Sequence, residues 1–192
     1  MPDSQPFLTK PTSWHVSVAA EAFAAAQFAR CGFDVSVQYG ANQPEYDLIV
    51  ARGDHLLKVS VKGSQDGGWG LTQSYMADAT KKSGKTADYH GAIDLWLARH
   101  GLRTVFCFVQ FHGVRLDQMP RIYLASAAEV AQQLRQAKDG QGDSILNENW
   151  TFTRGRCAGI TDKLPQNWVF SEQRVVELLT DRETGLAVKP GG

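Results

Sequence analysis

The sequence predicts a mixed α/β domain in which helices cover both faces of a sheet with parallel and antiparallel strands. Three observations predict this class. An Ala-rich helical segment comes first, three short strand-like segments follow it, and a further helical segment precedes a strongly apolar strand. A helix that connects two strands of one sheet is typical of a βαβ crossover, which makes those strands parallel. The predicted order is α-β-β-β-α-β-β-α, with one more helix near the C-terminus.

The first helix is predicted over residues 14–30. Thr12 and Ser13 supply side-chain oxygens for its N-cap, and Ala is its most frequent residue. Gly32 lies just beyond the segment, where helices commonly end because glycine adopts the left-handed conformation easily. These signals agree on both boundaries of the helix.

Glu21 is unusual in this helix because it is the only Asp, Glu, Lys or Arg between Lys10 and Arg30. A lone carboxylate on an apolar helix has two interpretations. It lies on a narrow solvent-exposed stripe with Ser17 and Gln27, as most helix carboxylates do, or it turns inward toward a site.

Three strands are predicted next, each bounded by turn residues. Apolar and polar residues alternate in the first and third, whereas the second is an apolar run. Gly53 followed by Asp54 suits the tight turn of a hairpin between the second and third strands. The three segments are residues 35–39, 46–51 and 57–61.

The rest of the chain is predicted to alternate between helices, strands and polar loops. Ser126 and Glu129 form a capping box that starts one helix. Part of another helix, residues 92–98, is also compatible with a strand. In chain order we expect a loop at 63–85 with a short helix near 73–80, a helix at 86–100, strands at 104–111 and 121–124, a helix at 127–138, a polar loop at 139–149 and a helix at 172–180.

The length of 192 residues indicates one domain with a small appendage. We expect a flexible N-terminus at 1–13, a core domain at 14–138 and a C-terminal extension at 139–192 that packs on the core. No apolar run reaches the ~20 residues of a membrane span, and residues 1–10 show no signal-peptide pattern. These features predict a cytoplasmic protein without a membrane partner.

Composition argues against a nucleic-acid binder that is basic as a whole and against a protein built on disulfides or zinc. Twenty basic and 20 acidic residues give a net charge of zero, so any binding of nucleic acid must come from a local basic patch. The cysteines, at 31, 107 and 157, are odd in number and form no CxxC pair. They predict reduced thiols and support neither a disulfide framework nor a zinc site.

The hairpin carries the geometry of a candidate site. A two-residue turn at 53–54 fixes the register and places Asp47 opposite Ser60. Because side chains alternate along a strand, Lys58, Ser60 and Lys62 then share one face with Asp47. A turn one residue longer or shorter would put Asp47 on the other face.

A Glu in the first helix, Asp47 inside Tyr46-Asp47-Leu48-Ile49-Val50 and Lys62 at the end of Val59-Ser60-Val61-Lys62 follow one another in this order. This arrangement resembles the PD-(D/E)XK nuclease superfamily, and its layout is most similar to the Holliday-junction-resolvase-like branch. The resemblance covers residues 14–65 by motif. It implies a restriction-endonuclease-like fold and hydrolysis of DNA phosphodiester bonds with Mg²⁺ or Mn²⁺. Glu21 and Asp47 would bind the metal, and Lys62 would be the catalytic lysine.

The sequence departs from that motif at two places. Ser60 stands where the family has its second acid, two residues before Lys62, and two residues separate Pro44 from Asp47. Mg²⁺ is commonly held by one or two carboxylates together with waters and phosphates, so Glu21 and Asp47 are sufficient for one ion. Ser60 would then assist through its hydroxyl or a water in place of a second acid.

Several alternatives remain open. Gln65 and Asp66, just beyond the strand, are substitute metal ligands. The same residues are also compatible with an ordinary polar sheet face that carries a cross-strand ion pair. In function, the alternatives to a nuclease are a catalytically degenerate relative that binds nucleic acid or protein without cleavage, and a small structural or immunity-type interaction module.

The charge distribution favours a DNA partner. Residues 52–103 contain eight basic and five acidic residues. We predict that basic residues of this segment bind phosphates, with a solvated loop as the alternative. We also expect a homodimer, because two-fold dimers are the commonest soluble oligomers. The candidate phosphate contacts are Lys58, Lys81, Lys82 and Lys85.

Overall fold

A five-stranded sheet forms the centre of the computed structural model, which describes residues 10–38, 45–101 and 104–184, with side chains placed up to residue 180. The strand order is β1-β2-β3-β5-β6, and only the β3–β5 pair is parallel. This arrangement confirms the predicted mixed α/β class. The strands are β1 (Asp34–Val37), β2 (Leu48–Arg52), β3 (His55–Ser64), β5 (Thr104–Gln110) and β6 (Arg121–Ser126).

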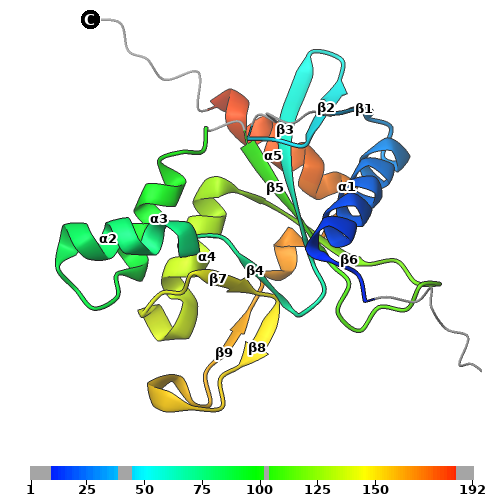
Figure 1. The fold of residues 1–192 in the computed structure, drawn as a ribbon. Coiled ribbons are helices and arrows are strands. Elements are labelled where there is room, and N and C mark those ends of the chain that lie inside the picture. The colour runs from blue at the N-terminus through cyan, green and yellow to red at the C-terminus, as the bar shows by residue number, and fades with distance from the viewer. Residues whose placement is uncertain (1–9, 39–44, 102–103, 185–192) are drawn as a thin grey trace, which may run out of the picture.

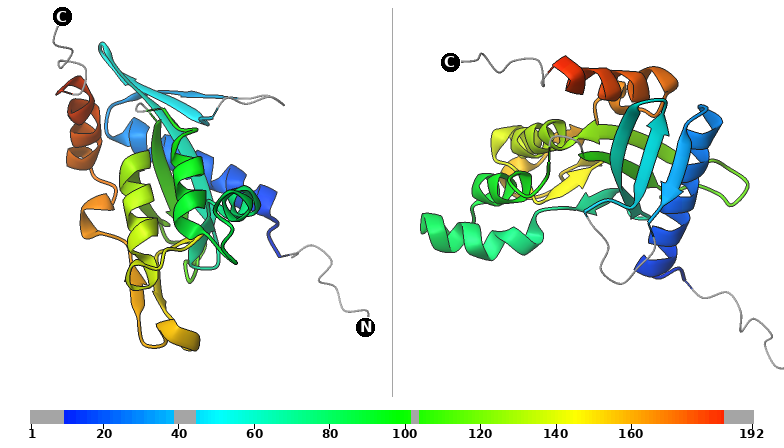
Figure 2. Two further views of the ribbon diagram at one scale, coloured as in Figure 1. Left: turned by 90° about the vertical axis from the view of Figure 1, so that its left-hand side faces the viewer. Right: turned by 90° about the horizontal axis from the view of Figure 1, so that it is seen from above.

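Helices cover both faces of the sheet (Figures 1 and 2). One face packs against α1 (Ser13–Arg30) and α5 (Glu172–Thr184), and the other against α3 (Tyr89–Leu97) and α4 (Ala127–Gly140). The α1 face combines aliphatic side chains and Phe rings with small Ala residues of α1, which let the helix approach the strands closely. Fully buried members of this layer include Ala20, Ala24, Phe28, Val59, Val105 and Cys107.

Side-chain alternation in β3 decides which residues reach each layer. Val59 and Val61 belong to the core under α1. Ser60 is paired in parallel register with Phe106, which belongs to the aromatic core under α3 and α4. Lys62 therefore emerges on the α3 side of the sheet, two residues after Ser60.

The hairpin register is confirmed. Leu48 pairs with Val59 and Arg52 with His55, so the turn has two residues, and Gly53 adopts the positive φ of 59° that such a turn requires. β2 begins at Leu48, so Asp47 precedes the strand instead of lying within the predicted segment 46–51. β1 ends at Val37, and the end of the predicted segment 35–39 lies outside the described residues.

Residues 63–85 contain more regular structure than the predicted loop. The expected short helix is present as a 3₁₀ turn (Gln73–Tyr75) that leads into α2 (Met76–Ser83), and α2 extends along α3 away from the sheet (Figures 1 and 2). The segment also contains β4 (Gly68–Gly70), which pairs with β7 (Ile145–Asn147). This pairing also corrects the predicted loop at 139–149, and it joins segments too distant in sequence for local patterns to indicate.

The remaining helices agree with the prediction in type. The helix expected at 86–100 is α3, and its N-cap is Asp88, whose carboxylate accepts a hydrogen bond of 3.0 Å from the Gly91 amide. The alternative of a strand at 92–98 is therefore wrong. Ser126 caps α4 in the predicted capping box. A last hairpin consists of β8 (Asn149–Thr151) and β9 (Thr161–Lys163).

Two smaller expectations concern membranes and thiols. Within the described parts of the chain, no helix combines the length and apolarity of a membrane span. All three cysteines are free, and burial raises the pKa of the Cys107 thiol well above its ordinary value.

Candidate active site

The candidate site lies where β2 stops and β3 continues. β3 runs on to Ser64, whereas its antiparallel partner begins only at Leu48, so the last residues of β3 have no β2 neighbour. The gap opens into a cleft of about 520 Å³ between α1, the end of β3 and β4. We call it the Asp47 cleft. Glu21, Asp47 and Lys62 all line it, so the three predicted site residues are brought together from separate segments.

Asp47 is held by hydrogen bonds on both sides. Its amide donates to the Val59 carbonyl at 2.8 Å, and its carbonyl accepts from the Gln38 amide at 2.9 Å. Its carboxylate Oδ2 accepts from the Val61 amide at 2.6 Å, a length typical of a charge-assisted bond. The side chain thus takes the place of the missing β2 backbone, which fixes the carboxylate at the edge of the cleft.

Glu21 is placed by the close approach of α1 to β3. A Cβ atom added at Gly63 would lie only 2.8 Å from the Val16 carbonyl oxygen and 2.9 Å from the Ala20 Cβ. Only glycine allows this contact, which sets the next residue of α1, Glu21, at the rim of the cleft. Glu21 is half-buried and lines the cleft, as does Ser17 of the alternative stripe, and its role in a site remains a prediction.

The electrostatics of Glu21 show how near the other two groups are. Partial burial is the main cause that raises its pKa, repulsion from the Asp47 carboxylate adds to the rise, and attraction to Lys62 opposes it. Two carboxylates whose charges repel one another in one cleft form a favourable environment for a divalent cation, which would neutralise both.

Ser60 and Lys62 extend the site to the α3 side of the sheet. Ser60 is buried, and its Oγ lies 3.5 Å from Asp47 Oδ2, at the outer limit of a hydrogen bond. The backbone carbonyl of Lys62 accepts a 2.9 Å hydrogen bond from the indole N–H of Trp69 on β4. No ion pair of Lys62 occurs among the described residues, and Lys62 lines the Asp47 cleft.

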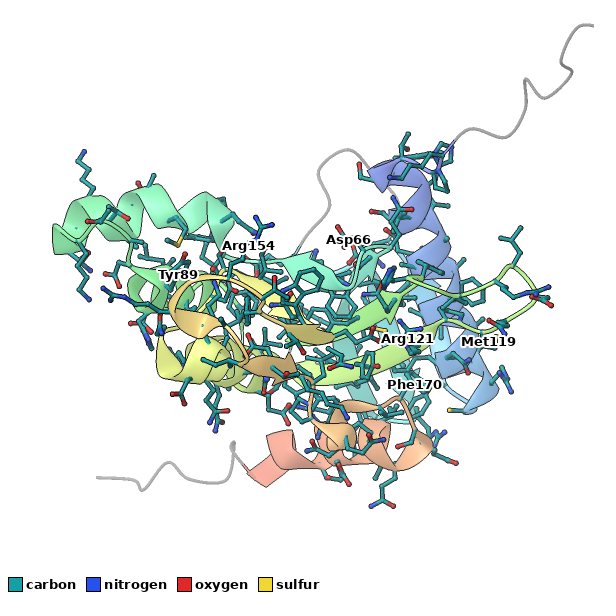
Figure 3. All side chains as sticks on the ribbon, turned by 90° about the horizontal axis from the view of Figure 1, so that it is seen from below. Asp66, Tyr89, Met119, Arg121, Arg154 and Phe170 are labelled. Atoms are coloured by element: carbon teal, nitrogen blue, oxygen red, sulfur yellow. The ribbon has the colours of Figure 1, made fainter. Side chains whose placement is uncertain are left out.

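The predicted metal ligands, Glu21 and Asp47, are two carboxylates that line the Asp47 cleft. No group of three or more His, Cys, Asp or Glu side chains suited to a metal occurs in the described parts of the chain. Asp66 lines the Asp47 cleft near the start of α1 (Figure 3), but its carboxylate accepts a 2.8 Å hydrogen bond from Ser64. Gln65 donates to the Pro11 carbonyl at 3.3 Å. Gln65 and Asp66 thus line the same cleft as Glu21 and Asp47, and their role as substitute metal ligands remains a prediction.

The predicted phosphate contacts lie outside the cleft. The Lys58 ammonium lies 4.9 Å from the centre of the Tyr46 ring, in a cation–π contact. Lys81 and Lys82 lie in the last turn of α2, and Lys85 is ion-paired with Asp88 at 3.6 Å. Their role in DNA binding remains a prediction.

A second pocket of about 540 Å³ adjoins the Asp47 cleft and shares Asp47 and Lys62 with it. We call it the His100 pocket. Its further lining residues come from the segment before α2, from α3 and its C-terminal end, and from β5, and sequence reasoning missed those on α3 and β5. Only an aromatic and basic composition near residues 96–100 could have indicated them. The main ones are Tyr75, Trp96, Arg99, His100 and Phe106.

Changing Gly63 to Ala is expected to disturb the site and the fold together. The added methyl group would meet the α1 backbone, so the helix must move away from β3 and carry Glu21 with it. Overpacking of this kind costs about 1–3 kcal/mol of unfolding free energy. Urea unfolding measures that loss, and Mg²⁺ binding should weaken in parallel. A Gly101→Ala variant, where an added Cβ meets no atom, is the matched control. An unchanged metal affinity in a destabilised Gly63→Ala protein would contradict this account of how Glu21 is placed.

Fold and site together define a mixed α/β protein with an open cleft that holds two carboxylates and a lysine. No protein-family model matches the chain, and no curated protein matches it significantly. Among solved structures, the chain is similar to a bacterial homing endonuclease, I-Ssp6803I, with a TM-score of 0.44 and 13% sequence identity. The match covers 92% of this chain and 99% of that one. At this level of similarity the neighbour assigns no activity to the chain.

Proposed function

We propose that the protein is a metal-dependent nuclease of the PD-(D/E)XK type that hydrolyses DNA phosphodiester bonds. The observation that supports this most is the meeting of Glu21, Asp47 and Lys62 in one open cleft. They come from a helix, a strand start and a strand end, in the order that the sequence motif predicts. An ordinary polar sheet face would not require a helix carboxylate to join them.

Glu21 and Asp47 would hold one Mg²⁺ or Mn²⁺ ion. Two carboxylates suit a hard cation that completes its shell with water and phosphate oxygens. Because Val61 occupies Oδ2 of Asp47, we expect the other oxygen, Oδ1, to face the ion. When bound, the metal would lower the pKa of a water and neutralise charge on the phosphate.

The remaining residues would act on the phosphate and on the geometry. The Lys62 ammonium would stabilise the negative charge that develops on the phosphate oxygens. The Trp69 hydrogen bond to the Lys62 carbonyl fixes the backbone from which that side chain projects. Ser60 would contribute a hydroxyl beside Asp47 where a second acid is missing. We expect a homodimer, because cutting both strands of a duplex requires two such clefts.

A catalytically degenerate protein that binds DNA or a protein partner is the second candidate. Ser60 favours it, since a hydroxyl removes one negative charge and one strong ligand from the site, and the described residues contain no group of three or more His, Cys, Asp or Glu side chains suited to a metal. An interaction module without a site is less well supported, because the cleft is open and lined by charged groups.

The test joins metal binding to cleavage. Wild-type protein is incubated with supercoiled plasmid and with branched DNA in Mg²⁺ or Mn²⁺, beside Asp47→Asn and a control, Asp54→Asn, in the hairpin turn. We expect metal-dependent cutting that Asp47→Asn abolishes, together with calorimetric metal binding that weakens at least tenfold. EDTA should stop the reaction.

The pH dependence of metal binding follows from Glu21. Because the pKa of Glu21 is raised, its carboxyl group stays protonated to a higher pH than an ordinary glutamate does in the free protein. A metal that binds there must displace this carboxyl proton. Metal affinity should therefore rise with pH, by up to about tenfold per unit below the pKa of Glu21. Metal binding and DNA binding without cleavage on any substrate would favour the degenerate protein, and absence of both would exclude a nuclease.

A further inference from the structure

The His100 pocket continues the Asp47 cleft across the sheet. Both are lined by Asp47, Lys62, Gly70 and Leu71, so Lys62 lies where the two hollows meet. A volume of about 540 Å³ is within the range of roughly 300–1,000 Å³ that small-molecule sites occupy. A phosphate held at Lys62 would therefore have a neighbouring hollow that is large enough for the rest of its nucleotide.

Aromatic rings form the walls of the His100 pocket. The His100 ring packs against Trp96 at 4.5 Å and against Phe106 at 5.0 Å between ring centres, while Trp96 and Phe106 are almost fully buried. Tyr75 lines the pocket from the 3₁₀ turn before α2 and is half-buried. The Trp96, His100 and Phe106 rings are tilted or edge-on to one another, so Tyr75 is the ring whose face a nucleobase could stack on.

The His100 side chain has polar atoms without hydrogen-bond partners. Both ring nitrogens of His100 are buried and find no hydrogen-bond partner among the described atoms. Buried polar atoms without partners are rare in folded proteins and often indicate a ligand or a functional role. Burial lowers the pKa of His100, Glu45 opposes this, and Lys62 and Arg99 add to it. The neutral ring has one donor and one acceptor, and a rotation of the ring toward the pocket would present them to the edge of a base.

We propose that the His100 pocket binds an unpaired nucleobase beside the phosphate held at Lys62, so that the substrate is DNA with an unpaired nucleotide at the cleavage site. The inference rests on the proposed function, which places the phosphate at Lys62. A base within a duplex has its edge paired and its faces stacked, so it cannot enter a pocket without leaving the helix. Single strands and flaps carry nucleotides that are already unpaired, so this step costs them less free energy than it costs an intact duplex.

The first experiment uses the wild-type chain and requires no variant to fold. A fluorescent oligothymidylate, an abasic strand of the same length and a duplex of the same length are titrated with protein in Ca²⁺, which is chosen to limit cleavage. We expect the oligothymidylate to bind about tenfold or more tightly than the abasic strand, since both carry the same phosphates and only one carries bases. Equal affinities for the two strands would overturn the proposal.

Variants then locate the base. Tyr75→Ala should weaken oligothymidylate binding to the level of the abasic strand, whereas Tyr75→Phe, which keeps the ring, should bind like wild type. Trp150→Ala is the matched control, because Trp150 is a half-exposed aromatic residue on β8 that lines neither hollow. A Tyr75→Ala protein that still distinguishes bases from abasic sites would place the base elsewhere and overturn the proposal.

Failure of this inference is distinguishable from failure of the nuclease. Cleavage that abasic substitution leaves unchanged would retain the nuclease and remove the base pocket. Base-dependent binding that Tyr75→Ala abolishes, without cleavage in Mg²⁺ or Mn²⁺, would retain the pocket in a protein that only binds. Among substrates, cutting of single strands and flaps in preference to intact duplex is the pattern that the pocket predicts.

Discussion

Substituting Lys62 by Met is expected to lower the rate of DNA cleavage by about 10²–10³-fold, the typical loss when one group that stabilises transition-state charge is removed. Met keeps the length of the side chain and removes the ammonium group. The backbone of the residue should not move, because the Trp69 indole binds its carbonyl and β5 pairs with it in parallel register. Single-turnover rates at saturating DNA measure the effect on the chemical step.

Metal binding distinguishes this role from a structural one. Lys62 attracts the charge of Glu21 in the free protein, so its removal should leave Mg²⁺ affinity unchanged or higher. Lys163→Met, on exposed β9, is the control for a lost positive charge. A Lys62→Met protein that cuts at the wild-type rate would refute the catalytic assignment, even if DNA affinity falls.

The hairpin is the part of the site that could be predicted from sequence. Its register depends only on local chemistry, a two-residue turn at 53–54 and alternation in the strands, and the observed pairs agree with it. Once the register is known, the common face of Ser60 and Lys62 follows from the geometry of a strand. That Asp47 precedes β2 and uses its side chain to bind Val61 could not be predicted, because strand ends depend on the neighbouring strands.

The position of Glu21 needed information that the helix pattern lacks. Its sequence neighbours are compatible with a solvent-exposed stripe as well as with a site. The choice is made by Gly63, more than 40 positions away, which lets α1 lie directly on β3. The His100 pocket has the same origin, since Tyr75 and His100 meet Lys62 only through packing of α3 on the sheet. Contacts between distant segments are the information that periodicity does not carry.

The largest expected loss of stability outside the site concerns the pair Glu129 and Arg174, which fastens α5 to α4 and β6. The Arg174 guanidinium is 6% exposed, donates to both Glu129 oxygens at 2.6 and 2.7 Å, and also binds the Leu124 carbonyl. Glu129 additionally accepts from the Ser126 amide at 2.7 Å as part of the α4 capping box. The Glu129 carboxylate thus pairs with a buried cation and also caps the first turn of α4.

Glu129→Ala should therefore lower the free energy of unfolding by about 3 kcal/mol, because the buried Arg174 charge then keeps only the Leu124 carbonyl and a 3.5 Å contact to Glu177. Urea unfolding measures the loss. Glu172→Ala, which removes an exposed carboxylate 3.5 Å from Arg52, should cost less than about 1 kcal/mol and serves as control. The double variant Glu129→Leu with Arg174→Met should recover part of the loss, because no unpaired charge then remains. A double variant less stable than Glu129→Ala would show that the ion pair itself stabilises the fold, beyond the cost of leaving Arg174 unpaired.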